Sequence, residues 1–242
     1  MIYKKALKKK IHNIIKDLFD NRIKSYKAVN DLSSKYYWAK YLIRDDSAGE
    51  PINTNRYPRV DKILKKYQAA YLGEGMSRIG FEIKHNNETF VFKLCFDNFF
   101  IEQSFISEKN ENQLEFNNIK TLSKNSYLKS LILPVVDYFY DSYGKDILVM
   151  PKIHVGFEHD KHRYNSHRED IIRSLCQDAH EGNVGQWKNL HWLFDVNSKI
   201  YDHDMEYVIK RHEKYISTSK TKGTKHRFKK AKKLINEFAL NY

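Results

Sequence analysis

The first 70 residues are patterned for helices. Apolar side chains recur at intervals of three and four positions, which places two sets each on one helical face: Ile11, Ile14, Ile15 and Leu18, and then Val60, Ile63, Leu64 and Tyr67. Between these sets, residues 45–58 (DDSAGEPINTNRYP) are rich in turn formers and predict a loop. We therefore expect residues 1–70 to form a helical extension that precedes a separate domain.

The pattern changes at Tyr71 to short alternating runs that are typical of β-strands. Residues 71–83 (YLGEGMSRIGFEI) and 89–96 (TFVFKLCF) flank the turn-forming residues 85–88 (HNNE). This arrangement predicts a β-hairpin that begins with a glycine-rich turn.

Helical and strand patterns alternate in the rest of the chain. A helix is predicted at 107–123, followed by strands at 131–141 (LILPVVDYFYD) and 146–153 (DILVMPKI). A helix around 168–176 then leads into a loop, QDAHEGNVG, a strand, LHWLFDV, and a basic helical tail. The element order predicts an α+β fold.

Composition narrows the class of protein. The chain has 242 residues, of which 41% are hydrophobic and 14% aromatic, as in globular rather than disordered proteins. It has no run of the roughly 18 apolar residues that span a membrane, and no apolar signal core at its N-terminus. We expect a cytoplasmic protein without a membrane partner. Cys95 and Cys176 do not form a disulfide or zinc pattern and are expected to be small core residues.

The formal charge of +13 indicates an anionic partner. The excess lies near the two ends, at residues 4–16 and 220–233. In the second segment, one face of a helix would carry Phe228, Ala231, Leu234, Ile235 and Phe238. The basic side of that helix is either a solvated surface or a contact for a polyanion, and the sequence leaves both open.

Gly73, Gly75 and Lys93 suggest a phosphate site. Glycines in a hairpin let the backbone close over phosphates, although Gly-x-Gly is also an ordinary turn. Lys93 interrupts an apolar strand, where alternation places it on one face with Val91 and Cys95. A buried ammonium group requires an anionic partner, whereas a lysine on an edge strand would reach solvent.

A second group of polar residues suits a magnesium ion. Asp178 and Asn183 lie five positions apart on a glycine-containing loop, and Asp195 ends an apolar strand twelve residues later. Carboxylate and amide oxygens are the ligands that Mg²⁺ takes beside substrate phosphates.

In this order the motifs resemble the protein-kinase-like superfamily, which includes aminoglycoside and choline phosphotransferases, and especially its small phage and bacterial members. LGEGMSRIGFEI is similar to the glycine-rich loop, FVFKL to the lysine-bearing strand and NQLEF to the helix with the paired glutamate. DILVMPKI is similar to the fifth strand and hinge, DAHEGN to the catalytic loop, and LFDV to the strand end with the metal-binding aspartate. The match spans residues 71–197, about half of the chain.

The resemblance implies a two-lobed fold. It has an antiparallel-sheet N-lobe with the hinge at 71–153, a reduced helical C-lobe at 154–242 that ends in the basic helix, and the added helical segment at 1–70.

The resemblance also implies roles for single residues. Lys93 binds the α- and β-phosphates of ATP and Glu115 orients it, with Glu111 as an alternative to Glu115. Asp178 accepts the proton of the acceptor hydroxyl, and the ligands of Mg²⁺ are Asn183 and Asp195. The nucleotide would further be held by Gly73, Gly75, Arg78, Val91 and backbone groups from Met150 to Ile153.

Several residues depart from the family pattern. Arg78 stands where a third loop glycine is common, and could itself bind phosphate. Cys176 and Gln177 replace the histidine and arginine before the catalytic aspartate, which argues against regulation through a phosphorylated activation loop. His180 resembles small-molecule phosphotransferases, while the compact chain leaves little room for a small-molecule pocket, so a protein serine or threonine is the favoured acceptor.

Two other functions compete with this hypothesis. The first is a non-catalytic pseudokinase that binds nucleic acid or protein through its basic termini. The second is a metal-dependent nuclease or zinc protein, suggested by four histidines whose spacing matches no metal signature: His154, His159, His162 and His167.

Overall fold

The computed structural model of the protein describes residues 2–25, 58–74, 78–95, 111–141, 146–155, 183–196, 205–218 and 222–240. The chain divides into two compact units. Unit 1 comprises Met1–Glu111 and Phe139–Val149, and unit 2 comprises Asn112–Tyr138 and Met150–Tyr242. Within the described ranges, no helix is long and apolar enough to cross a membrane.

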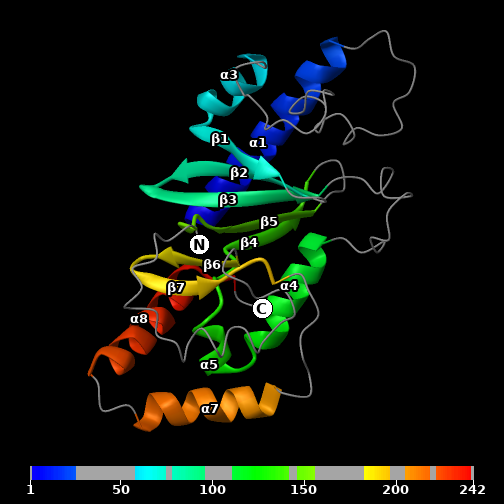
Figure 1. Ribbon diagram of the computed structural model, residues 1–242. Helices are drawn as coiled ribbons and strands as arrows, with labels where there is room; N and C mark the ends of the chain where they lie inside the picture. The colour runs from blue at the N-terminus through cyan, green and yellow to red at the C-terminus, as the bar shows by residue number, and fades with distance from the viewer. Residues whose placement is uncertain are drawn as a thin grey trace. The chain divides into compact units, whose positions relative to one another are not determined.

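The main feature of unit 1 is a five-stranded antiparallel sheet in the order β1-β2-β3-β5-β4 (Figure 1). Its strands are β1 (Ala69–Glu74), β2 (Arg78–His85), β3 (Glu88–Cys95), β4 (Asp137–Tyr140, from Phe139 on) and β5 (Asp146–Pro151, up to Val149). Together with a second, two-stranded sheet and the helices, it confirms the predicted α+β class.

The hairpin of β2 and β3 forms as the sequence predicts. Asn86 and Asn87 occupy its two-residue turn with φ of 50° and 62°, the left-handed conformation that asparagine tolerates well. Phe81 and Phe92 pair across the two strands, and their rings stack with centroids 5.0 Å apart. The turn and this pair fix the register of the hairpin.

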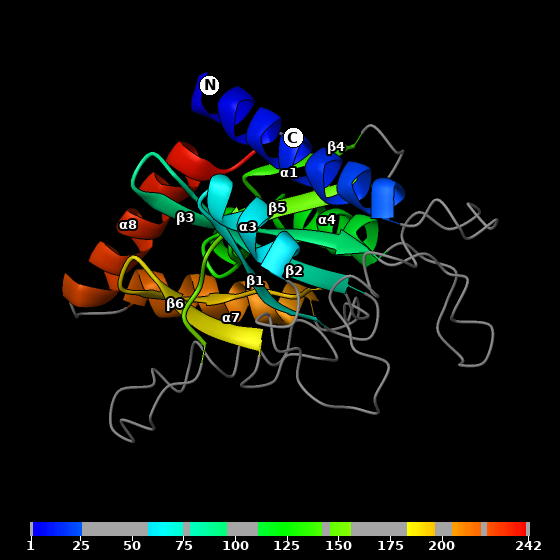
Figure 2. The same ribbon diagram turned by 90° about the horizontal axis from the view of Figure 1, so that it is seen from above.

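Two helices from the N-terminal segment pack in unit 1 (Figure 2). Helix α1 (Ile2–Ser25) buries the predicted stripe of Ile11, Ile14, Ile15 and Leu18. Lys10 of α1 donates to the backbone oxygen of Lys84 at 2.8 Å. Helix α3 (Pro58–Lys66) packs on β1, so both helices belong to the same unit as the sheet.

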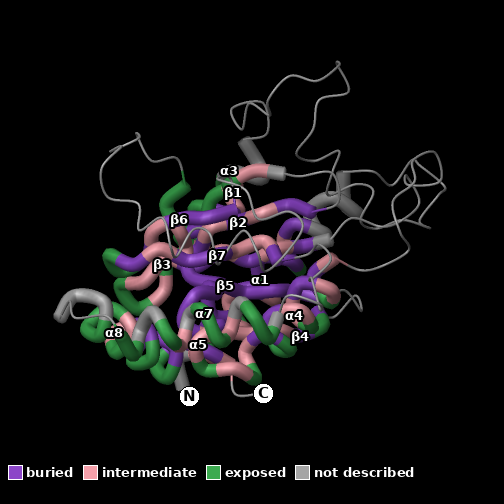
Figure 3. Tube along the Cα trace, turned by 60° about the horizontal axis from the view of Figure 1, so that its bottom comes forward, coloured by how far each residue is buried: buried purple, intermediate pink, exposed green. Residues whose placement is uncertain are grey.

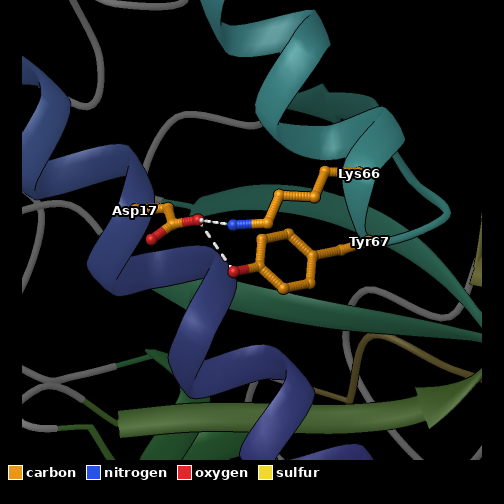
Figure 4. A network of polar contacts seen from close by, with 3 residues as sticks. All are labelled: Asp17, Lys66 and Tyr67. Atoms are coloured by element: carbon orange, nitrogen blue, oxygen red, sulfur yellow. Dashed lines mark hydrogen bonds and ion pairs between the residues drawn. The ribbon is translucent and has the colours of Figure 1, made fainter.

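A polar network joins α1 to the end of α3 (Figure 4). Oδ2 of Asp17 accepts hydrogen bonds from Nζ of Lys66 at 2.8 Å and from the hydroxyl of Tyr67 at 2.7 Å. The hydrogen bond from Lys66, together with that from Tyr67, lowers the pKa of Asp17 below its ordinary value.

Unit 2 combines helices with the small sheet. It contains α4 (Glu111–Leu122, from Asn112 on), α5 (Ser126–Lys129), β6 (Val184–Trp187), β7 (Leu190–Leu193), α7 (Met205–Thr218) and α8 (Lys222–Phe238). The side chain of Asn125 caps α5 by accepting from the N–H groups of Tyr127 and Leu128. Trp187 lies between Trp192 and Phe238, with ring centroids 5.8 and 5.1 Å away. These contacts place α8 against the β6–β7 hairpin.

The strand prediction for 131–141 is only partly right, because the regular strand is limited to Asp137–Tyr140. Residues 131–136 are buried but pair elsewhere: the N–H of Leu133 donates to the oxygen of Leu193, and the N–H of Leu193 donates to the oxygen of Leu131. Pro134 has no N–H for a ladder. Strand β6 and the separate helix α7 were not predicted, and the predicted helix at 168–176 lies outside the described residues.

Candidate functional site

A row of three paired residues crosses β1, β2 and β3. Gly73 pairs with Gly80, and Gly80 pairs with Lys93. Directly paired residues share one face of a sheet, so the Lys93 side chain lies beside two positions that have none. Among the described residues, apart from its two neighbours in the chain, no atom lies within 4 Å of a Cβ placed on Gly73. We call these three positions the glycine–lysine row. The register of β1 shifts between Tyr71 and Gly73, and the side chain of Leu72 comes within 3.9 Å of where a Cβ on Gly80 would stand.

The two faces of the β2–β3 hairpin differ in polarity. The face opposite Lys93 is apolar and buried, and carries Ile79, Phe81, Ile83, Phe90, Phe92 and Leu94. On the Lys93 face, Glu82 and Val91 form the next pair and are half-buried, as is Lys93 itself. The alternation predicted for this strand is therefore confirmed over residues 90–94.

Arg78 begins β2 and is nearly buried. Its Nε lies 3.2 Å from Oε2 of Glu111, and the two side chains are 9% and 25% exposed. Such a partly desolvated pair holds both groups more firmly than a surface ion pair. Arg78 thus has a carboxylate partner within unit 1, at the start of α4.

In unit 2, the β6–β7 hairpin brings Asn183 near Asp195. Its register pairs Val184 with Leu193, and one step further the N–H of Phe194 donates to the backbone oxygen of Asn183 at 2.9 Å. Asp195 is the next residue. Two oxygen-bearing side chains twelve positions apart in sequence are therefore carried at the same end of one short hairpin.

The backbone at Asp195 has a φ of 60°, in the left-handed region. For a residue other than glycine this conformation is uncommon, and the strain is of order 1–3 kcal/mol at functional sites. Asparagine and aspartate tolerate it best. The hairpin ends where the backbone changes direction at Asp195. Asp195 is half-buried, whereas Asn183 is buried.

Helix α4 presents a buried acidic residue. Glu115 has no exposed surface and lies on the same helical stripe as Ile119 and Leu122. One turn from Glu115, Nδ2 of Asn118 donates to the backbone oxygen of Val196 at 2.8 Å. Glu115 therefore does not lie on a solvated face of the helix. The hydrogen bond of Asn118 connects α4 to Val196, the residue that follows Asp195.

The segment from Met150 to Ile153 leaves β5 and meets β6. Pro151 has no N–H, so the backbone donors in this segment belong to Met150, Lys152 and Ile153. Just beyond it, His154 and Gln186 exchange two backbone hydrogen bonds of 3.0 and 2.9 Å. A Cβ added to Gly185 would lie 2.5 Å from Cγ1 of Ile153, so this contact requires glycine.

Some predicted site residues fall outside the described part of the chain. These are Gly75, Asp178 and three of the four histidines: His159, His162 and His167. His154 is described and is exposed. Among the residues that the structure describes, no group of three or more His, Cys, Asp or Glu side chains is arranged to hold a metal ion.

Sequence reasoning missed Gly80 and Asn118. The sequence pattern places Gly80 in a strand, but its pairing with both Gly73 and Lys93 depends on the register of three strands. Asn118 lies three residues after Glu115 on α4. Residues three apart share one face of a helix, so this spacing could have identified Asn118 from the sequence.

The chain was compared with known proteins in two ways. No protein-family model matches it, and no curated protein is significantly similar to it.

Proposed function

We propose that this protein is a two-lobed, kinase-like phosphotransferase that moves the γ-phosphoryl group of ATP to a hydroxyl, with a protein serine or threonine as the acceptor. The antiparallel sheet of unit 1 corresponds to the N-lobe, and the helices and small hairpin of unit 2 to a reduced C-lobe. Because the reaction consumes ATP, a cytoplasmic location is part of the proposal.

The observation that carries this proposal is the hairpin that joins Asn183 to Asp195. An amide and a carboxylate oxygen are hard ligands of the kind that Mg²⁺ accepts, with waters and phosphate oxygens completing its shell. The hydrogen bond from the N–H of Phe194 to the backbone oxygen of Asn183 holds the two chain segments that carry Asn183 and Asp195 together at the end of the hairpin. The left-handed backbone at Asp195 supports a functional role, since a strained residue requires a reason to persist.

The glycine–lysine row supports the phosphate-binding part of the proposal. Gly73 and Gly80 carry no Cβ, so a large anion can approach the backbone at these positions more closely than it could beside a side chain. The ammonium group of Lys93 lies on the same face and supplies positive charge. We assign the α- and β-phosphates of ATP to this row, with Val91 on the same face beside the adenine.

Glu115 is the glutamate that we assign to orient Lys93. A carboxylate without exposed surface requires cationic or hydrogen-bonding partners. The alternative, Glu111, is paired with Arg78. Through this ion pair, we assign Arg78 the role of holding the start of α4. Binding of phosphate by Arg78 is compatible with that role.

In the proposed mechanism the chain positions reactants and neutralises charge. Lys93 holds the phosphates, Asn183 and Asp195 hold Mg²⁺, and the backbone from Met150 to Ile153 holds the adenine. Bound Mg²⁺ supplies neutralisation of the charge on the transferring phosphoryl group. Asp178 accepts the proton of the acceptor hydroxyl. The hydroxyl oxygen bonds to the γ-phosphorus, and the bond from the γ-phosphorus to the β,γ-bridging oxygen breaks, so that this oxygen leaves with ADP.

The test is transfer of label from radiolabelled ATP in the presence of Mg²⁺, with and without host-cell extract. We expect the parent protein to label an acceptor, and Lys93→Ala and Asp178→Ala to label none. Lys84→Ala is the matched control, because Lys84 lies on the same strand face as Gly80 but is exposed and four residues away. This control is expected to transfer label as the parent does.

The size of the labelled product separates a protein acceptor from a small molecule. If the parent transfers no label but binds ATP in a Mg²⁺-dependent manner, the protein is a pseudokinase. Absence of both would refute the assignment of Lys93, Asn183 and Asp195.

A further inference from the structure

The outer side of α8 carries an unusually dense set of cations. The helix contains seven lysine and arginine residues and a single acidic residue, Glu237, near its end. Six of the basic residues lie within residues 225–233, and all but the half-buried Lys230 are exposed: Lys225, Arg227, Lys229, Lys232 and Lys233. Among the described residues, no ion pair neutralises any of these side chains.

Three of these lysines form one stripe, which turns by about 40° around the helix axis at each step. Lys225, Lys229 and Lys233 are four residues apart, so they lie one above another on one side of the helix. At a rise of 1.5 Å per residue, the stripe advances about 6 Å per step and about 12 Å in all. A nucleic-acid strand carries one charge per roughly 3.4 Å along the duplex axis, so the stripe spans several phosphates.

The apolar side of α8 is already occupied. Ala231, Leu234, Ile235 and Phe238 are buried, and the alternation of buried and exposed positions along the helix is visible in Figure 3. Phe238 meets the ring of Trp187 edge-on, while Phe228 stacks on Tyr127 at 5.2 Å. A membrane-surface helix inserts its apolar face into lipid. For α8 that face is held inside unit 2. Among its described residues, the exposed ones are five cations together with His226, Asn236 and Glu237.

Among its described residues, the exposed side of α8 also lacks the apolar anchors that a stable protein partner uses. Protein interfaces depend on apolar and aromatic anchors at their centre. Between Lys225 and Lys233, the large apolar side chain is Phe228, which is half-buried and covered by Lys232, whose Nζ lies 4.6 Å from the ring centroid. Binding to a nucleic-acid backbone needs no such anchor, because it is almost wholly electrostatic.

We propose that the cationic side of α8 is a binding surface for the phosphate backbone of a nucleic acid, without base specificity. Contacts with Tyr127 and Trp187 hold both halves of the helix against the rest of unit 2. The hydrogen bond from the N–H of Leu240 to the oxygen of Val135, 2.7 Å long, fixes the chain just beyond its end. This surface does not depend on phosphotransfer, so either proposal can fail alone.

The experiment measures binding of the full chain to labelled DNA and RNA duplexes of mixed sequence, about 20 base pairs long, over a range of salt concentrations. The test variant carries Lys225→Gln, Lys229→Gln and Lys233→Gln. The matched control carries Lys62→Gln, Lys120→Gln and Lys124→Gln, which removes the same charge from exposed lysines outside α8. Thermal unfolding of both variants checks that they fold as the parent does.

We expect the parent to bind duplex with an affinity that falls linearly with salt on logarithmic axes. The α8 variant should lose about three units of that slope and at least about tenfold in affinity at low salt, because each lysine releases about one counterion. The control should retain the slope. Equal losses in both variants, no binding by the parent, or tighter binding to anionic vesicles or to polyglutamate than to either duplex would overturn the proposal.

Discussion

Lys93 lies directly across from Gly80 in the β2–β3 ladder, and Gly80 lies directly across from Gly73. β3 therefore supplies a charge at the point where β2 and β1 carry glycine. The backbone tolerates a larger residue at Gly80, because an added Cβ would have its nearest contact at 3.7 Å, with the oxygen of Gly73. The space is thus a property of the proposed site and is not required for folding.

A Gly80→Val substitution tests this space. Valine favours strands, whereas glycine in a strand costs about 0.5–1 kcal/mol, so the free energy of unfolding should stay the same or rise. Affinity for ATP in the presence of Mg²⁺ should fall by at least about tenfold, equivalent to about 1.4 kcal/mol, since the new side chain fills the approach to Lys93. Calorimetric titration with ATP measures the effect. Unchanged affinity in a folded Gly80→Val protein would show that phosphates do not use this row.

A Gly185→Ala substitution, unlike Gly80→Val, should lower the free energy of unfolding. The added Cβ would lie 2.5 Å from Cγ1 and 2.8 Å from Cδ1 of Ile153, and 2.9 Å from the backbone oxygen of His154. We expect a loss of about 1–3 kcal/mol in the free energy of unfolding, which urea denaturation measures. Adding Ile153→Ala should restore part of the loss that Gly185→Ala causes, because it removes two of the three clashing atoms. If Gly185→Ala unfolds at the same urea concentration as the parent, β6 does not pack closely on this segment.

An Asp195→Asn substitution separates charge from backbone strain. Asparagine also tolerates the φ of 60° at this position, so the free energy of unfolding should change by no more than about 0.5 kcal/mol. Removing the carboxylate charge should weaken the Mg²⁺-dependent part of ATP binding at least about tenfold. Titrations with and without Mg²⁺ measure that part. Asp137→Asn is the control, since Asp137 lies on β4 and has no proposed metal role.

Glu115→Gln and Glu111→Gln distinguish the two glutamates of α4. Glu115→Gln should reduce label transfer while leaving the Arg78 pair intact. Glu111→Gln removes the charge that faces the nearly buried Arg78, so it should lower the free energy of unfolding by about 1–3 kcal/mol and leave transfer largely unchanged. Label transfer and urea denaturation of the Glu115→Gln and Glu111→Gln variants measure these two effects. Reversed effects would assign the role in orienting Lys93 to Glu111.

The link between α1 and α3 should weaken in acid. The hydrogen bond from Lys66, with that from Tyr67, holds the pKa of Asp17 below its ordinary value. A depressed pKa means that the stabilisation is complete above the unfolded-state pKa, about 3.9, and is lost as the pH falls through the lower, folded-state pKa. Lys66 is 63% exposed, so water screens the pair and its contribution to the free energy of unfolding is small.

Asp17→Asn should accordingly be slightly less stable than the parent at neutral pH. The difference between the two proteins should shrink as the pH falls through the acid range. Urea denaturation at a series of pH values measures it. A difference that stays constant with pH would mean that the carboxylate charge of Asp17 does not contribute.

Local patterns of sequence were enough to predict much of unit 1. Alternation placed Lys93 and Val91 on one face of their strand, since the period of two leaves no alternative once the strand is assigned. The turn at Asn86 and Asn87 set the hairpin, and helical spacing located the buried stripe of α1.

Contacts between distant residues could not be read in the same way. The pairing of Gly80 with Gly73 and Lys93 depends on the register of three strands, and the pairing of Arg78 with Glu111 joins residues 33 positions apart. Strand β6 has only four residues, one of them Gly185, so it carries too little pattern to distinguish it from a loop. Leu131 and Leu133 have the pattern of strand residues, but their backbone groups form hydrogen bonds with Leu193. Tertiary packing determines this pairing, so the local sequence does not reveal it.

The closed geometry of the β6–β7 hairpin also gives a criterion for finding relatives of this protein. Lys188 and Asn189 form its two-residue turn with φ of 52° and 60°, and strands of four residues lead from that turn towards Asn183 and Asp195. Inserting or deleting one residue in either strand would invert the facing of every residue beyond it. A homologous sequence should therefore preserve the interval of eleven residues between the asparagine and the aspartate even where every residue within it has changed.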